Sequence, residues 1–421
     1  MVVGGAWRSL LNRGLIASRN PWKSIAKGSS CVREYHDTGK ASIPGPRGAA
    51  NTRVVDLRSD TVTKPTPAMR RAMASAEVGD DVMGEDPTVN ELQKVAAELF
   101  RMEAALFVTS GTMGNLLAAM VHCRRRDDEM IVGDLSHIHI YEQGGSAYLA
   151  GVHSTTVRTQ PDGTFDLTEL ESKIRHGYPD PHYPRTRLIC VENTHNIRGG
   201  RALPLTFLQE VRALADRYGV SVHMDGARVM NAAVAQRVPL ATILQHTHTV
   251  SVCLSKGLGA PVGTILAGPK AFISQARRYR KALGGGMRQA GIIAAAGKVA
   301  LLEMSGRLEE DHHNARTFAQ ALLSSGSPLF TVDMDCVETN ILRFFLDPRL
   351  GPDEFCARMA QVGEGEEEEL GQGIQVLMFP YFGNSVRAVW HLGISSEETQ
   401  LAVQKMKFVA AQVLKETVGT Q

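Results

Sequence analysis

The chain has 421 residues, of which 43% are hydrophobic, so it can bury a large core and is long enough for two domains. Its formal net charge is only +2, and its apolar runs fall well short of the ~20 residues that a membrane-spanning helix needs, so we do not expect a membrane protein. The six cysteines are scattered without a C-x-x-C pair, which is typical of reduced thiols in an intracellular protein and argues against a disulfide framework or a zinc site.

The first segment differs from the rest of the chain in charge. Residues 1–35 contain six basic residues and one acidic residue, and one tryptophan and three leucines fall there at helical spacing. This composition is typical of a mitochondrial transit peptide, with a disordered basic tail as the alternative. We predict that residues 1–52 are a presequence and linker, and that the protein is mitochondrial (matrix), or cytoplasmic if the presequence is not used. The remaining chain has 40 basic and 43 acidic residues, which argues against a nucleic-acid-binding protein.

From residue 105 onward, short apolar runs alternate with helical patterns. Residues 205–219 carry one apolar face and end at Gly219, a typical helix stop. Continuous apolar strands separated by helices predict a parallel sheet that is covered on both faces. The strand candidates are residues 105–110, 129–134, 155–159, 187–193, 220–225 and 250–255.

Beyond about residue 300 the pattern changes to strands with turns, followed by a terminal amphipathic helix. We therefore predict an α/β fold with a large domain at residues 53–300 and a smaller α+β domain at residues 301–421. The acidic run at residues 363–373 is interpreted as a solvated loop without a function of its own.

A lysine, Lys256, follows the apolar strand 250–255 and enters a glycine-rich turn. A buried lysine loses hydration and its pKa falls, and the neutral amine can then form a Schiff base with pyridoxal phosphate. The alternative is a lysine that reaches solvent from a strand end. Asp225 ends another predicted strand, and both residues would emerge at the carboxyl edge of the sheet, where open α/β sheets bind ligands. A carboxylate there can pair with a pyridinium nitrogen.

A phosphate group would need a cradle, and the segment TSGTMGN offers one. Ser110, Gly111 and Thr112 stand where a strand turns into a helix, so backbone N–H groups, a hydroxyl and the helix dipole converge on an anion. The alternative is an ordinary helix N-cap. The segment lacks the lysine of a Walker A loop and the spacing of a Rossmann fingerprint.

The resemblance to a known family is carried by seven segments in chain order, namely VVDLRSDTVTKPT, VGDDVMGEDPTVNEL, SGTMGN, VENTHN, HMDGAR, LSKGLGAPVG and GGGMRQAG. The chain resembles the threonine aldolases of the low-specificity or L-allo type. These are pyridoxal-phosphate enzymes of the fold type I, aspartate-aminotransferase-like superfamily. The resemblance is dense over residues 54–305 and loose over the last hundred residues.

The resemblance implies how the cofactor is bound. Lys256 would form the Schiff base, and Asp225 would pair with the pyridine nitrogen. His137 matches the histidine that stacks over the cofactor ring, and His139 is the neighbour that is easily confused with it. Ser110, Gly111 and Thr112 would hold the phosphate, Arg228 would also contact the cofactor, and Arg288 would reach a phosphate, of its own or of a neighbouring subunit.

The resemblance also implies how the substrate is bound. Its carboxylate would be held by Ser59, Arg228 and Arg387, because a planar guanidinium suits a carboxylate. An arginine on an exposed strand face is the alternative for Arg387, since Trp390 stands nearby where the family commonly has a smaller residue. Two further residues would line the pocket, Tyr141 and, beside the substrate hydroxyl, His182.

The implied reaction is the retro-aldol cleavage of L-threonine or L-allo-threonine to glycine and acetaldehyde, with His137 or His182 as the general base and no metal ion. The resemblance further implies a homodimer or homotetramer with the active site at the subunit interface. Alternatives are another fold type I enzyme, such as a serine hydroxymethyltransferase, an aminotransferase or a desulfurase, and a non-catalytic relative. The presence together of Lys256, Asp225, Arg228 and His137 favours an enzyme.

Overall fold

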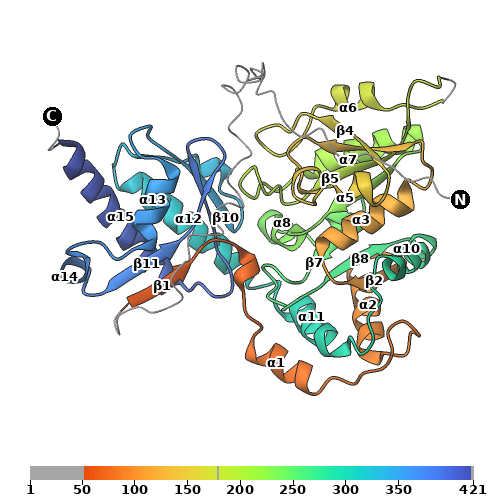
Figure 1. Ribbon diagram of the computed structural model, residues 1–421, viewed down its shortest axis with the longest axis horizontal. Coiled ribbons are helices and arrows are strands. Elements are labelled where there is room, and N and C mark those ends of the chain that lie inside the picture. Colours follow the sequence, from red (N-terminus) through yellow and green to blue (C-terminus); the bar gives the residue numbers. More distant parts are fainter. Residues whose placement is uncertain (1–51, 178–179, 419–421) are drawn as a thin grey trace, which may run out of the picture. The chain divides into compact units, whose positions relative to one another are not determined.

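The computed structural model describes residues 52–177 and 180–418 (Figure 1). The predicted presequence and linker therefore lie outside the described residues, apart from Thr52. Across the two described ranges, none of the helices combines the length and the apolar character that crossing a bilayer requires.

The larger core is built on a seven-stranded sheet with the strand order β2-β8-β7-β6-β5-β3-β4. The sheet is mostly parallel, and only β8 runs antiparallel to both of its neighbours. Its strands are β2 (Ala104–Val108), β3 (Asp128–Gly133), β4 (His153–Val157), β5 (Arg185–Glu192), β6 (Ser221–Asp225), β7 (Thr249–Cys253) and β8 (Thr264–Gly268).

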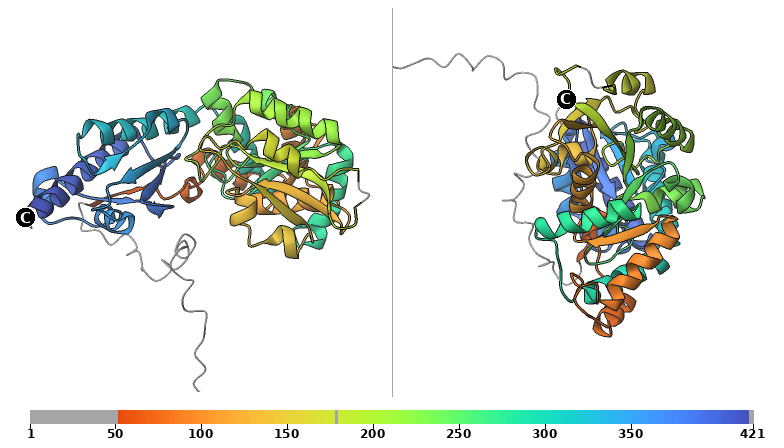
Figure 2. Two further views of the ribbon diagram at one scale, coloured as in Figure 1. Left: turned by 90° about the horizontal axis from the view of Figure 1, so that it is seen from above. Right: turned by 90° about the vertical axis from the view of Figure 1, so that its right-hand side faces the viewer.

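Helices cover both faces of this sheet (Figure 2). On β2 the side chain of Phe107 packs into one apolar core and the neighbouring Leu106 into another, because successive side chains of a strand point to opposite faces. Every residue of β3, β7 and β8 is buried, as expected for strands of a sheet that is covered on both faces, and β3 buries the acidic Asp128 and Glu129 together with its apolar residues. The helices of the larger core are α1 (Pro67–Ala74), α2 (Pro87–Phe100), α3 (Gly111–His122), α4 (His137–Ile140), α5 (Gly145–Tyr148), α6 (Leu167–Lys173), α7 (Leu205–Tyr218), α8 (Val229–Gln236), α9 (Leu240–Leu244), α10 (Lys270–Ala282) and α11 (Gly291–Glu303).

A second core follows in the chain and is built on a four-stranded antiparallel sheet with the order β12-β13-β10-β9. Trp390 is fully buried in this core, and its indole N–H donates to Thr399 Oγ1 at 3.1 Å. The elements are α12 (Leu308–Ser324), β9 (Phe330–Thr331), η4 (Met334–Cys336), β10 (Ile341–Leu346), α13 (Pro352–Ala360), α14 (Glu366–Leu370), β11 (Gly373–Leu377), β12 (Phe379–Tyr381), β13 (Ser385–Val389) and α15 (Ser396–Val418).

The first described strand, β1 (Thr52–Asp56), belongs to this second core although it stands at the start of the chain. It pairs in parallel with β11, beside which Figure 1 shows it. Val55 and the nearby Leu57 are fully buried in the second core. The short 3₁₀ helix η3 (Asp60–Val62) then leads toward α1. The segment that precedes the larger core is thus held by a strand more than 300 residues away, a contact that no local pattern indicates.

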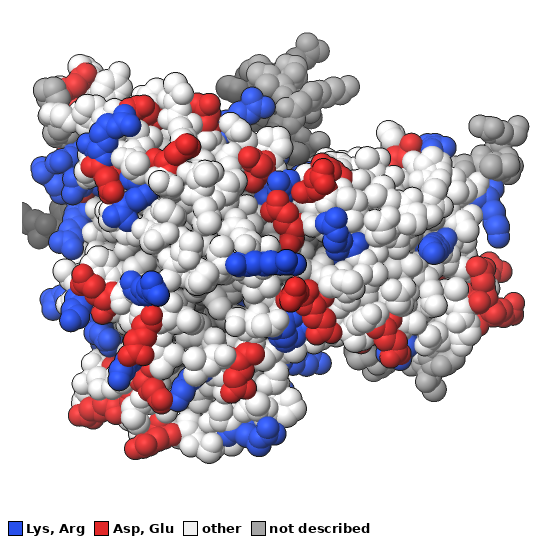
Figure 3. All heavy atoms as spheres, turned by 180° about the vertical axis from the view of Figure 1, so that it is seen from behind, with Lys and Arg blue, Asp and Glu red and all other residues white. Residues whose placement is uncertain are grey.

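The interpretation of the acidic run as a solvated loop is wrong for one of its residues. Glu366 begins the short helix α14 and is fully buried. Its carboxylate accepts hydrogen bonds from the backbone N–H of Gly363 at 2.6 Å and of Ile374 at 2.9 Å, and it forms an ion pair with the buried Lys405. A charge can be buried where such partners replace its hydration. On the molecular face in Figure 3, basic and acidic side chains are interspersed.

Candidate active site

The carboxyl ends of the parallel strands bring the predicted cofactor residues to one edge of the large sheet. Asp225 is the last residue of β6, and Lys256 follows the end of β7, which is the neighbouring parallel strand. Lys256 is half-buried, whereas the sequence led us to expect a buried amine. No hydrogen-bond acceptor for its ammonium group is found among the described residues, so the amine is available to a ligand.

Asp225 is held rigidly in its place. The side chain is 4% exposed, its Oδ1 accepts from the backbone N–H of Ala227 at 3.1 Å, and its Oδ2 accepts from Asn115 Nδ2 at 2.9 Å. Asn115 is fixed in turn, because its Oδ1 accepts from Ser251 Oγ at 2.6 Å and lies 3.1 Å from Nε2 of His223. The carboxylate therefore has a defined orientation toward the strand edge before any ligand binds.

His137 lies beside this carboxylate and completes a buried polar network. Its backbone N–H donates to Glu192 Oε2 at 2.6 Å, and its Nδ1 lies 3.0 Å from Glu142 Oε1. Glu142 Oε1 also accepts from Asn115 Nδ2 at 2.9 Å. One ring nitrogen of His137 and one carboxylate oxygen each of Glu142 and Asp225 all lie within 4.8 Å of one another. His137 is half-buried, whereas His139 on the same short helix is exposed, and this difference separates the two candidates.

The network shifts the proton affinities of its members. Burial works to lower the pKa of His137, but the hydrogen bond to Glu142 and the charge of Asp225 prevail and raise this pKa above its ordinary value. Burial raises the pKa of Glu142 as well, and the nearby charge of Asp225 adds to the rise. Sequence reasoning missed Glu142 and Asn115. Asn115 lies in the segment SGTMGN, and Glu142 follows His137 by five residues, so both stand close in the sequence to residues that were predicted.

The predicted phosphate cradle lies at the start of α3. Ser110 is the N-cap and its Oγ accepts from the backbone N–H of Met113 at 3.2 Å, while Ser110 and Thr112 are exposed. A Cβ added to Gly111 would lie 2.9 Å from Cys253 Sγ, so a side chain at this position would displace its neighbours. Within the described ranges, the N–H groups of Gly111 and Thr112 have no acceptor. They are therefore free to bind an anion at a helix N-terminus.

Arg228 has a carboxylate partner within the chain. Its Nε and Nη2 donate to the two oxygens of Asp60 at 2.6 and 2.7 Å, and both residues are buried. Although burial acts to raise the pKa of Asp60, Arg228 first and then Lys256 and Arg387 lower it well below its usual range. Arg228 thus contacts Asp60 directly, and Lys256 and Arg387 act on its charge from nearby. Sequence reasoning missed Asp60 because Ser59 was the residue selected in the segment LRSDT.

The remaining substrate residues lie near this cluster or beside His137. Arg387 lies on β13 and is 4% exposed, so it is not an arginine of an exposed strand face. Ser59 is the N-cap of η3, and its Oγ accepts from the hydroxyl of Thr61 at 2.9 Å. The ring of Tyr141 lies 5.5 Å from that of His137, centroid to centroid.

The structure does not bring His182 and Arg288 to this site within one chain. His182 precedes β5 and therefore lies at the amino edge of the parallel strands, opposite Asp225. Its side chain is 83% exposed and pairs with Asp180 at 2.6 Å. Arg288 is 55% exposed, and its Nη1 donates to Asp80 Oδ2 at 2.6 Å. Of the two predicted bases, only His137 belongs to the network of this chain.

Comparison with known proteins places the chain in a family. The model of the family described as beta-eliminating lyase matches residues 56–344, more than half of the chain. The chain belongs to the beta-eliminating lyase family. The chain is similar to the low-specificity L-threonine aldolase 1 of Arabidopsis thaliana, with 50% identity over 295 residues that cover 70% of this chain and 81% of the relative. It is 41% identical over 359 residues to the low specificity L-threonine aldolase of Escherichia coli, covering 85% of this chain and 100% of the relative.

Solved structures of other proteins that match this chain show its fold. The threonine aldolase of Leishmania major matches with a TM-score of 0.68 at 20% identity, covering 85% of this chain and 99% of that chain. The serine palmitoyltransferase of Sphingomonas wittichii matches with a TM-score of 0.64 at 17% identity, covering 85% and 87%. The predictions of fold type I architecture and of a pyridoxal-phosphate-dependent lyase are confirmed.

The residues at the strand edge fit this cofactor. A half-buried amine without a hydrogen-bond acceptor, a fixed carboxylate and free N–H groups at a helix start match its aldehyde, its ring nitrogen and its phosphate in kind. Lys256, Asp225 and the residues Ser110, Gly111 and Thr112 would hold it.

Proposed function

We propose that this beta-eliminating lyase is a low-specificity threonine aldolase that cleaves L-threonine and L-allo-threonine into glycine and acetaldehyde. The observation that carries the proposal is the network of His137, Glu142, Asn115 and Asp225 at the edge where Lys256 emerges. Support comes from the 41% identity to the Escherichia coli aldolase, which is matched over its whole length.

When bound, pyridoxal phosphate supplies an electron sink for the pair released as the Cα–Cβ bond of the substrate breaks. The chain's own residues orient the substrate and move the proton. Arg228 donates from Nε and Nη2 to Asp60. These two hydrogen bonds fix the plane of the guanidinium group and leave Nη1 for the substrate carboxylate. A fixed guanidinium and the nearby Arg387 hold the amino acid so that the bond to be broken has one defined direction.

His137 is the general base in this proposal. Its Nδ1 faces Glu142, so Nε2 remains to accept the proton of the β-hydroxyl. A base of this kind contributes on the order of 10²–10⁴-fold to the rate. Both epimers place a hydroxyl on Cβ, and a base held by one hydrogen bond can turn toward either position. We therefore expect both substrates to react.

A coupled acetaldehyde assay on both epimers tests the proposal. We expect glycine and acetaldehyde in equal amounts, and loss of turnover and of the visible absorbance of the bound cofactor in Lys256→Ala. An aminotransferase would instead require a keto acid, and a hydroxymethyltransferase would depend on added tetrahydrofolate. Absence of acetaldehyde from cofactor-loaded protein with either epimer would contradict the assignment.

We also propose that the enzyme is a homodimer or homotetramer whose site is completed by a neighbouring subunit. His182 lies at the amino edge and is exposed, so it can serve only the site of another subunit. If His182→Ala lowers turnover, mixing it with the inactive Lys256→Ala chain should restore activity, because one of the two sites in a mixed pair then has both residues. No gain on mixing subunits that exchange would contradict this role.

We further propose that residues 1–52 direct the protein to the mitochondrial matrix, on the support of their basic, acid-poor composition. A fluorescent protein that carries residues 1–52 should accumulate in mitochondria. The same fusion with the six basic residues of positions 1–35 changed to glutamine should remain in the cytosol.

A further inference from the structure

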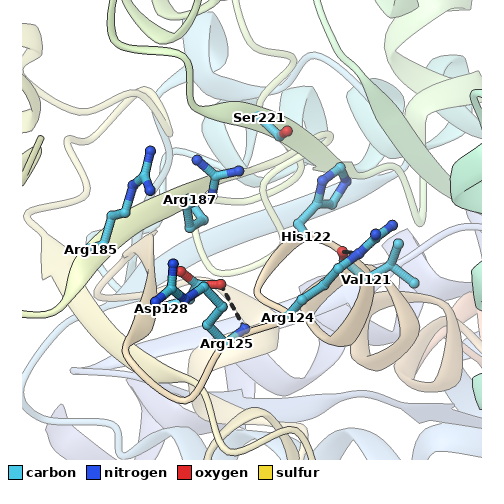
Figure 4. Close-up of a pocket in the computed structure, with 8 residues that line it drawn as sticks. All are labelled: Val121, His122, Arg124, Arg125, Asp128, Arg185, Arg187 and Ser221. Atoms are coloured by element: carbon cyan, nitrogen blue, oxygen red, sulfur yellow. Dashed lines mark hydrogen bonds between the residues drawn. The ribbon is translucent and has the colours of Figure 1, made fainter.

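A pocket lies at the amino edge of the seven-stranded sheet, and Figure 4 shows the residues that line it. Asp225 and Lys256 lie at the opposite, carboxyl edge. The pocket has a volume of about 450 Å³, within the ~300–1,000 Å³ typical of small-molecule sites. The strands β3, β5 and β6 begin here, and α3, whose first turn is the proposed phosphate cradle, ends here. The proposed aldolase reaction uses none of the residues of this pocket.

Four arginines line this pocket, namely Arg124, Arg125, Arg185 and Arg187. Arg185 and Arg187 alternate along β5, so their side chains leave the strand on the same side, as Figure 4 shows. Among the described residues that line the pocket, Asp128 is the only one with a carboxylate. The pocket therefore concentrates positive charge.

Two of the arginines have structural partners. Arg125 pairs with Asp127 at 3.2 Å between Nε and Oδ1. Arg124 Nε donates to the carbonyl oxygen of Val121 at 3.0 Å, which suits a cation at the negative end of the α3 dipole. The helix end and the neighbouring acid thus account for these two residues without any ligand.

For Arg185 and Arg187, no comparable structural partner explains why they lie in the pocket. Within residues 52–177 and 180–418, neither guanidinium lies within ion-pair distance of a carboxylate, although both side chains are half-buried. Asp128, which is 3% exposed, directs one oxygen to the backbone N–H of Arg125 at 2.9 Å and so fixes the loop before β3. Two adjacent guanidinium groups without counter-charge repel each other, and a bound anion would relieve that repulsion.

The remaining titratable group of the lining, His122, carries no charge near neutral pH. Burial lowers the pKa of His122 to about 3, and the nearby cations, Arg124 and Arg187 among them, act in the same direction. Its Nε2 lies 2.9 Å from Thr249 Oγ1, inside the sheet. The charge of the pocket therefore resides in arginines, which remain protonated throughout the physiological range.

We propose that this pocket is a binding site for a small anion that carries two or more phosphate groups, separate from the catalytic site. Arg185 and Arg187 offer paired N–H donors to phosphate oxygens in the bidentate geometry that guanidinium favours. Arg124 and Arg125 at the mouth add long-range attraction. Because the site lies at the other edge of the sheet, substrate and anion should bind without competing.

Titration calorimetry with inorganic tripolyphosphate tests the proposal on the full chain loaded with pyridoxal phosphate, so that the cofactor's own phosphate site is filled. At constant ionic strength we expect one anion per chain, with an affinity unchanged by saturating glycine. Orthophosphate should bind at least about tenfold more weakly, since it cannot reach both arginines. Equally tight binding of citrate would overturn the assignment to phosphate groups.

The double variant Arg185→Ser with Arg187→Ser should weaken tripolyphosphate binding at least about tenfold. Arg70→Ser with Arg71→Ser, which removes the same charge from α1, should leave it within about twofold. Unchanged binding in the first variant, or no binding by the parent, would overturn the proposal. If the first variant fails to fold, Arg187→Lys serves instead, because it keeps the charge and loses the fork. Binding to it as tight as to the parent would equally overturn the proposed contact.

Discussion

Glu142 determines how His137 can act as a base. Its carboxylate is buried, shares one amide donor with Asp225 and lies next to His137. Two carboxylates in such a setting favour a positive charge on the imidazole between them, which is why the pKa of His137 is raised despite burial. Since only the neutral imidazole accepts a proton, the proposed activity should fall as the pH falls through this raised pKa.

We predict that Glu142→Gln moves the acid limb of the pH profile of kcat/KM to lower pH, because the pKa of His137 loses its main upward contribution. At neutral pH the rate should fall roughly tenfold, since the imidazole is then less well oriented. The profile from acid to neutral pH measures both effects. Glu210→Gln on the exposed side of α7 is the matched control, and an acid limb at the parental position in Glu142→Gln would contradict the role of Glu142.

The pair of Asp60 and Arg228 makes a different prediction. Replacing Asp60 by Asn leaves a buried guanidinium without its counter-charge, and breaking such a pair costs about 3–5 kcal/mol. We expect a loss of this size in the free energy of unfolding measured with urea. Asp347→Asn removes a surface pair with Arg349 and should change stability little. A small loss in Asp60→Asn would show that water or a neighbour replaces the carboxylate.

At the scale of elements, the start of α3 links packing to cofactor binding. Replacing a glycine within a helix by alanine usually stabilises the helix by about 1 kcal/mol. At residue 111 the added Cβ would lie 2.9 Å from Cys253 Sγ at the end of β7. The helix start would have to move away from the strand that precedes Lys256.

We therefore predict that Gly111→Ala weakens pyridoxal phosphate binding about tenfold or more without stabilising the apo-protein. A cofactor titration followed by visible absorbance measures the effect. The double variant Gly111→Ala with Cys253→Ala removes the sulfur and should recover most of the affinity. If the double variant binds as poorly as the single one, the contact with Cys253 is not the cause.

The same elements show what the sequence could and could not predict. Asp225 and Lys256 were predicted because Asp225 ends an apolar strand and Lys256 follows another, and the carboxyl ends of parallel strands lie at the same edge of a sheet. Asn115 and Asp60 were missed because their roles come from partners 27 to 168 residues away in the chain. Glu142 was missed although its partner His137 is near in the chain, because the sequence does not show that the turn after α4 brings the two side chains together. The pairing of β1 with β11 and the burial of Glu366 were missed for the same reason. A local pattern indicates an element, whereas its partners depend on the whole topology.

At the scale of the whole molecule, buried histidines tie stability to pH. Burial lowers the pKa of His122 to about 3 and those of His223 and His312 to about 4. In the unfolded chain each titrates near 6.5, so below that value the unfolded state binds more protons than the folded one. Their contribution to stability is complete above about pH 6.5 and is lost as the pH falls toward 4. His137, whose pKa is raised, acts in the opposite direction.

We predict that the free energy of unfolding falls between pH 6.5 and pH 5 by up to ~2 kcal/mol for each of the three histidines, at about 1.4 kcal/mol per pH unit. Urea unfolding without cofactor is the appropriate measurement, because cofactor binding adds a pH dependence of its own. His223→Gln should be less stable at neutral pH, since Asn115 loses a partner, yet show a shallower slope. The slope identifies the cause, because lost packing would lower stability equally at every pH, whereas removing a proton-binding group changes how stability varies with pH. A variant whose slope matched the parent's would mean that His223 binds a proton equally well in the folded and the unfolded chain.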